Sequence, residues 1–176
     1  MWTSVGVASS IIVFGAFSIV ALTGGAHMTC DASLWPHVHD VQRLEITNGC
    51  QTVTGVIATI DSSADGDVEM QLTLDPGFGH LLNDGNVTKL NGNLQIEAIC
   101  QAPVRSDQPD ARRTCGNFRG TVPIPAVGAR VQVTGVHVLD SNHGWMEIHP
   151  ISALTAVAAS PQPPAPSPQP PASSPY

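Results

Sequence analysis

The chain of 176 residues suits one domain with short additional segments, because a single hydrophobic core commonly occupies about 100–150 residues. Its 7 Lys and Arg against 14 Asp and Glu give a formal net charge of −7. This charge repels phosphate backbones, so nucleic acid is disfavoured as a partner.

An uncharged segment near the start of the chain predicts export. Residues 5–22 carry no charged side chain, and residues 23–26 are small, as signal peptidases require. We therefore expect residues 1–26 to be a signal peptide. The alternative is an uncleaved membrane anchor, because eighteen residues just reach the length of a membrane span. Either way the rest of the chain is extracytoplasmic, secreted or anchored, and meets the membrane only through residues 5–22.

Four cysteines follow this segment, namely Cys30, Cys50, Cys100 and Cys115. An even number of cysteines in an exported chain predicts disulfides. Three connectivities are open, and proximity in sequence favours Cys30–Cys50 and Cys100–Cys115, each closing a loop worth about 3 kcal/mol. No pair has the C-x₂₋₄-C spacing of a zinc site.

Two segments differ in composition from the rest of the chain. Residues 27–49 are polar and irregular, and we expect them to pack on the domain as an N-terminal extension held by Cys30. Residues 158–176 include eight prolines and no charged side chain, which predicts a disordered tail with polyproline II character. Such a tail serves as a spacer or as a ligand for aromatic grooves.

Residues 50–157 have the period-two pattern and β-branched residues of strands. A helical turn is expected at residues 78–83 and a tight turn at residues 91–92. The predicted strand segments are Val53–Ile60, Val68–Leu74, Val87–Leu90, Leu94–Ile99, Arg130–Leu139 and Trp145–Leu154.

Five or six strands, with Gly55 and Gly135 where strands must bend, predict a small closed barrel in a mainly β protein. The oligonucleotide/oligosaccharide-binding (OB) barrel is the first choice. A β-sandwich is the alternative, disfavoured because seven regularly spaced strands are hard to find.

The segment from Val127 to Gly135, followed by the run HGWMEIHP at His143–Pro150, resembles uncharacterised exported OB-like domains of bacteria and archaea. The resemblance covers about residues 50–154. It implies an OB-like fold and export, and it transfers no catalytic residue, because these domains have no established activity.

The last predicted strand offers a candidate metal site. Strand periodicity places Trp145, Glu147 and His149 on one face, with Met146 and Ile148 on the other. If Gly135 marks a bulge, His137 turns outward beside Glu147. His137, Glu147 and His149 would then suit a divalent cation such as zinc. The alternative is a hydrogen-bonded cluster without metal, in which Glu147 orients a histidine; Trp145 is the candidate ligand-binding aromatic.

A second candidate site lies in and just beyond the loop closed by the later cysteine pair. It gathers four cations, Arg105, Arg112, Arg113 and Arg119. An anion or a nucleic acid could bind there, although Asp107 and Asp110 halve the local charge and a solvated surface explains such a loop as well. Asp61–Asp67 fits a hairpin turn better than a calcium loop.

No nucleophile elbow, Walker loop or catalytic metal motif occurs, so we expect no enzyme, no catalytic residue and no cofactor. The sequence predicts a binding module of the cell surface or periplasm. Its expected partner is a saccharide of the cell envelope, a peptide or a protein surface. A divalent-metal protein using His137, Glu147 and His149 is the alternative, and anion binding by the arginine loop is a weaker one.

Overall fold

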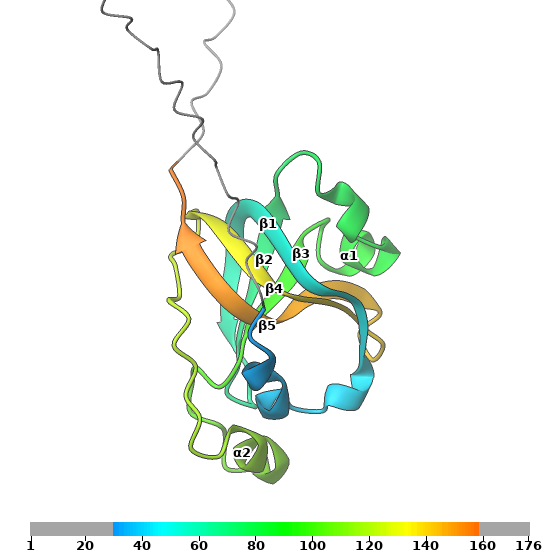
Figure 1. Cartoon of the computed structure of the whole chain (residues 1–176). Helices are drawn as coiled ribbons and strands as arrows, with labels where there is room; N and C mark the ends of the chain where they lie inside the picture. The colour runs from blue at the N-terminus through cyan, green and yellow to red at the C-terminus, as the bar shows by residue number, and fades with distance from the viewer. Residues whose placement is uncertain (1–29, 159–176) are drawn as a thin grey trace, which may run out of the picture.

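The computed structural model describes residues 30–158 (Figure 1). The predicted export segment at residues 1–26 lies outside the described residues, as does the predicted tail apart from residue 158. Within residues 30–158, no helix combines the length and the apolar character that crossing a membrane requires.

The described part is mainly β. Its strands are β1 (Leu44–Ser62), β2 (Val68–Leu74), β3 (Leu94–Ala98), β4 (Arg130–Asp140) and β5 (Trp145–Ala156). Its helices are α1 (Asp84–Lys89), α2 (Pro109–Cys115) and the 3₁₀ turns η1 (Ala32–His37), η2 (Val41–Arg43) and η3 (Gly79–Leu81). Alternating residues predicted β2, β4 and β5 to within two residues at each end.

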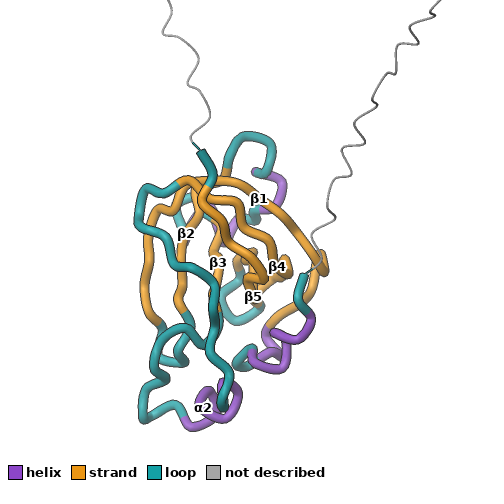
Figure 2. The backbone as a smooth tube through the Cα atoms, turned by 60° about the vertical axis from the view of Figure 1, so that its left-hand side comes forward, coloured by secondary structure: helices purple, strands orange, loops and turns teal. Residues whose placement is uncertain are grey.

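The five strands form one sheet that closes in a ring, in the order β1-β2-β3-β5-β4. Figure 2 shows the strands curving around a common centre. The pairs β1–β2, β1–β4, β2–β3 and β4–β5 are antiparallel, while β3 and β5 are parallel. Residues 44–56 of the long strand β1 pair with β4 and residues 55–62 pair with β2. The two ranges overlap at Gly55, where a Cβ would lie 2.3 Å from the Thr73 carbonyl oxygen.

The hydrophobic core lies inside the ring. Inward residues of β2 alternate with outward polar ones, as period two requires. The largest buried core side chains are Ile57, Met70, Leu72, Leu94, Ile96, Ile148 and Ile151.

The N-terminal extension packs against the outside of the sheet. Its residues Val38 and Leu44 form a second apolar cluster with Ile99 and Val138. Strand β1 begins at Leu44, because Leu44 already pairs with Asp140 at the end of β4. Within the predicted range 27–49, residues 30–43 are therefore the irregular part that the structure describes.

Two disulfides join the cysteines as proximity predicted. Cys30 bonds to Cys50 and Cys100 bonds to Cys115, with Cα–Cα distances of 5.3 and 5.7 Å. The first ties the extension to β1, and the second closes the loop that carries α2. Both bonds are consistent with an oxidising compartment.

The prediction of extended backbone at Val87–Leu90 was wrong, because residues 84–89 form helix α1. Its start is fixed locally: the Asn83 side chain accepts a hydrogen bond from the Asn86 amide, and the Asn86 side chain accepts one from the Asn83 amide. The Asn86 side chain also donates to the Met146 carbonyl, which anchors the helix on β5. This capping outweighs the strand preference of Val87 and Thr88.

Candidate functional site

The outer face of β2, β3 and β5 carries a row of polar side chains. Glu69 on β2 pairs in register with Glu97 on β3, and the parallel pairing of Gln95 with Glu147 brings β5 alongside. Because the neighbouring residues Met70, Ile96 and Ile148 point into the core, these carboxylates point out of the ring. The period-two prediction for β5 is thus confirmed, since Ile148 faces the core while Glu147 and His149 contact each other on the opposite face.

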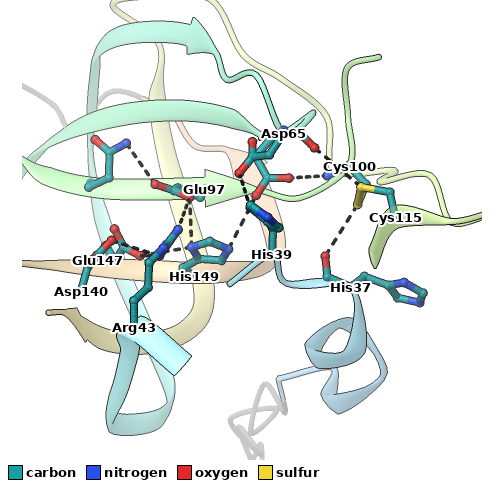
Figure 3. A network of polar contacts seen from close by, with 12 residues as sticks. His37, His39, Arg43, Asp65, Glu97, Cys100, Cys115, Asp140, Glu147 and His149 are labelled. Carbon is teal, nitrogen blue, oxygen red and sulfur yellow. Dashed lines mark hydrogen bonds and ion pairs between the residues drawn. A yellow bond between two sulfur atoms is a disulfide. The ribbon is translucent and has the colours of Figure 1, made fainter. Parts of the chain in front are cut away.

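His149 lies at the centre of this row and is fully buried. Its Nδ1 is 3.0 Å from Glu97 Oε2 and 3.1 Å from Glu147 Oε1. Figure 3 shows the three side chains pointing toward one another from β3 and β5. On the other side of the imidazole, Nε2 of His149 lies 3.7 Å from Asp67 Oδ2. We call the group Asp67, Glu97, Glu147, His149, Arg43 and Asp140 the polar cluster.

Arg43 of the extension lies over the carboxylates of the polar cluster. Its Nη1 lies 3.0 Å from Asp140 Oδ2 and 3.8 Å from Glu147 Oε1, and its Nη2 lies 4.0 Å from Glu97 Oε2. One guanidinium therefore faces carboxylates from β3, β4 and β5 (Figure 3). Without this cation the buried carboxylates would repel one another at close range.

The protonation of the polar cluster follows from burial and charge together. Burial opposes a charge on His149, but Glu97 and Glu147 outweigh it and raise the pKa of the imidazole to about 10. Burial raises the pKa of Glu97 as well, yet the charge and hydrogen bond of His149 reverse the sign and leave it lowered. The resulting ion pair of His149 with Glu97 is the central contact of the cluster.

Two other acids of the row are held toward the neutral form. Burial, with the charge of Glu97 added, raises the pKa of Glu147. Burial also raises the pKa of Asp67 to about 7, helped by the nearby Asp65 charge. The carboxylates therefore compete for few cations, which is the kind of environment found at functional sites.

A cleft of about 370 Å³ opens above the polar cluster. Three parts of the fold form it: the β1–β2 loop, the outer faces of β2 and β3, and the β4–β5 loop, with the extension along one side. It is lined by His39, Asp40, Arg43, Ser63, Asp65, Glu69, Glu97, Asn142, His143 and Trp145. Its four carboxylates against one arginine make it acidic.

Trp145 and His143 form the aromatic rim of the cleft. Their rings stack with centroids 4.4 Å apart and planes 4° from parallel. The Trp145 indole donates a hydrogen bond to Glu147 Oε2 at 3.0 Å. Asp140 fixes the β4–β5 loop, which carries His143, because its Oδ1 accepts hydrogen bonds from the Asn142 and His143 amides. Four residues of the run HGWMEIHP, namely His143, Trp145, Glu147 and His149, thus line the cleft or the polar cluster.

His137 does not join Glu147 and His149. Its Nε2 lies 3.1 Å from the Leu81 carbonyl oxygen and its Nδ1 lies 2.6 Å from Thr47 Oγ1. The expected bulge at Gly135 falls on the other strand: the register shifts on both sides of Gly135, between its pair with Ile151 and those of Thr134 with Ala153 and His137 with Ile148, and the extra residue is on β5 each time. Strand β4 therefore keeps its alternation, and the outward orientation predicted for His137 was wrong.

The four loop arginines are all exposed. Arg105 pairs with Asp107, and Arg113 pairs with Asp110. Arg112 and Arg119 line a separate shallow depression of about 260 Å³ beside the Cys100–Cys115 disulfide. The structure thus divides the predicted anion site into two ion-paired arginines and two that share a surface.

Sequence reasoning missed Arg43, Asp67, Glu97 and Asp140. Glu97 left a visible signal, because Gln95 and Glu97 alternate with Leu94, Ile96 and Ala98 in a strand that is buried on both faces. Polar residues at such positions indicate a buried polar network.

No known protein family and no curated protein matches the chain in sequence. The function proposed below therefore follows from the geometry of the cleft.

Proposed function

We propose that this protein is a non-enzymatic, extracytoplasmic OB-like module that binds a neutral or amino-bearing saccharide of the cell envelope. The observation that carries the proposal is the position of the cleft. OB barrels bind oligonucleotides and oligosaccharides on the face of their second and third strands, between the β1–β2 and β4–β5 loops. The cleft is lined by Ser63 and Asp65 of the first loop, Glu69 and Glu97 of those strands, and Asn142 and His143 of the second loop.

The strand order supports the OB-like assignment. Five strands close in the order β1-β2-β3-β5-β4, and a long, bent β1 pairs with both β2 and β4. This arrangement agrees with a small five-stranded Greek-key barrel. The predicted export segment and the two disulfides support a place outside the cytoplasm.

The charge of the cleft favours saccharides over oligonucleotides, the two ligand classes that OB barrels bind. Asp65, Glu69 and Glu97 would repel a phosphate backbone, and the net charge of −7 adds to this repulsion. Carboxylates accept hydrogen bonds from sugar hydroxyl and amino groups. The rim residues Trp145 and His143 add aromatic surface for the apolar face of a sugar ring. A neutral or amino-bearing saccharide fits both features.

Isothermal titration of the full exported chain against chito-oligosaccharides and peptidoglycan fragments tests the proposal. Because an aromatic contact contributes about 0.5–1.5 kcal/mol, His143→Ala should weaken binding by about 2–13-fold. His80→Ala is the matched control, since His80 is also exposed but does not line the cleft. Binding of cationic peptides in place of every saccharide, or equal loss in both variants, would contradict the proposal.

A further inference from the structure

We propose that a divalent transition-metal ion, with zinc as the first candidate, binds at the floor of the cleft between Asp67, Glu97 and His149. This site goes beyond saccharide binding and does not depend on it. The three residues come from the end of the β1–β2 loop, from β3 and from β5. Each can offer one ligand atom, and these atoms all lie within 4.8 Å of one another.

Two atoms of the site are buried without a hydrogen-bond partner among the described residues. They are Oδ2 of Asp67 and Nε2 of His149, which lie 3.7 Å apart. Asp67 is 2% exposed and His149 is 0% exposed, so neither atom reaches bulk water. Leaving a buried polar atom unpaired costs about 1–3 kcal/mol, and an ion between the two would satisfy both. Their spacing suits zinc, because bonds of about 2.1 Å in a tetrahedron separate ligand atoms by about 3.4 Å.

The surroundings of His149 match those of a metal-bound histidine. A ligating imidazole donates its second N–H to a carboxylate, which fixes the ring and leaves the other nitrogen free for the metal. Here Nδ1 lies 3.0 Å from Glu97 Oε2 and 3.1 Å from Glu147 Oε1, so Nε2 is the nitrogen directed at Asp67, and zinc would replace the proton that the imidazolium carries there in the metal-free protein. Glu147 is itself held by the Trp145 indole.

Asp67 is oriented in a similar way. Its Oδ1 accepts a hydrogen bond from the Cys100 amide at 2.8 Å, and Cys100 is fixed by its disulfide to Cys115. The remaining oxygen, Oδ2, is thereby directed toward His149. Glu97 is the third ligand: its Oε2 lies 3.0 Å from His149 Nδ1 in the metal-free protein, so its carboxylate would turn toward Nε2 to reach the ion, and its side chain is 8% exposed between the polar cluster and the cleft. An ion can enter there, and a water molecule from the cleft can complete four-coordination.

The test uses the full exported chain, purified without a histidine tag and dialysed against chelator. We expect it to take up one equivalent of Zn²⁺ by metal analysis and to melt at a higher temperature with Zn²⁺ than with chelator. Co²⁺ loading should give the visible absorption of a four-coordinate N/O site. No uptake, no melting response and no Co²⁺ spectrum would overturn the proposal, and a response to Ca²⁺ but not to Zn²⁺ would overturn the choice of a transition metal.

Three variants locate the ion. Asp67→Asn keeps the acceptor for the Cys100 amide but removes the charged ligand, and it should abolish stoichiometric Zn²⁺ uptake. His137→Gln alters a buried histidine outside the site and should keep full uptake. Glu147→Gln should weaken Zn²⁺ affinity by about 10–100-fold through the loss of its orienting charge. Uptake that survives in Asp67→Asn, or is lost in His137→Gln, would place any bound ion elsewhere. Because the Zn²⁺ assays contain no saccharide, their outcome is independent of the saccharide-binding proposal.

Discussion

The indole Nε1 of Trp145 donates a hydrogen bond to Glu147 Oε2 at 3.0 Å, while Glu147 Oε1 lies 3.1 Å from Nδ1 of His149. One buried carboxylate therefore joins a residue at the rim of the cleft to the histidine beneath its floor. A change at Glu147 should affect both the stability of the sheet and the shape of the cleft.

Glu147→Ala should lower the free energy of unfolding by about 1–3 kcal/mol, because it leaves the half-buried Trp145 indole without its acceptor and removes one of the two carboxylates at His149 Nδ1. Urea denaturation with chelator present measures this loss in the absence of metal. Glu45→Ala is the matched control: Glu45 is exposed on β1, and such surface changes stay within about 0.5 kcal/mol. An equally small effect of both substitutions would show that the polar cluster contributes little to folding.

His137 should make the protein less stable in mild acid. Burial, together with the charge of His80, lowers the pKa of His137 below its ordinary value of 6.5, although the Leu81 carbonyl opposes this. The unfolded chain then binds more protons than the folded one. The stability contributed by neutral His137 is therefore fully present above pH 6.5 and is lost as the pH falls toward the lowered pKa.

Urea denaturation between about pH 7.5 and about pH 5 measures this loss as the difference between wild type and His137→Gln. The subtraction matters because Asp67, with its pKa raised to about 7, acts in the opposite direction: its ionisation destabilises the fold as the pH rises. Both proteins keep Asp67, so only the His137 contribution remains. Parallel pH profiles for the two proteins would contradict the prediction.

The strands and the disulfides could be predicted because each depends on nearby residues. Alternation in Val68, Met70 and Leu72 is a property of a few consecutive positions, and it predicted β2 to the residue. The cysteine pairs close short loops of 20 and 15 residues.

The polar cluster could not be predicted in the same way, because it depends on which strands become neighbours. Glu97 meets His149 only because β3 and β5 pair in parallel, with Gln95 opposite Glu147. Arg43 reaches the carboxylates of the cluster from the irregular N-terminal extension. An alternating pattern of residues predicts strands, but it does not predict the path of such a segment. His137 was placed on the wrong face because a bulge shifts one strand against another, and the sequence does not say which strand carries the extra residue.

The Cys100–Cys115 disulfide should contribute about 3 kcal/mol to stability, as expected for a closed loop of 15 residues. The double variant Cys100→Ser with Cys115→Ser should show this loss in urea under non-reducing conditions. It should also loosen the backbone amide that holds Asp67. Reduction of the wild type should lower its melting temperature, and an unchanged melting temperature would mean that neither bond restrains the unfolded chain.

Reversal of charge in the cleft should convert it toward nucleic-acid binding. In the OB-like barrel that we propose, the cleft occupies the position at which such barrels hold oligonucleotides, and Asp65 and Glu69 place negative charge along it. We therefore expect no binding of single-stranded DNA by the wild type at moderate salt. Asp65→Lys with Glu69→Lys should gain weak binding that falls steeply with salt, since each added lysine can displace counterions from the phosphates.

The matched control is Asp61→Lys with Glu45→Lys, which makes the same change in net charge at exposed positions that do not line the cleft. If overall charge alone excluded DNA, both double variants would gain equal affinity in a fluorescence-anisotropy titration. We expect a larger gain in the cleft variant, because its lysines lie where the two loops and the strand face converge. Tight, salt-sensitive DNA binding by the wild type would overturn the saccharide assignment, because the charge of the cleft is the reason for preferring a sugar over a phosphate backbone.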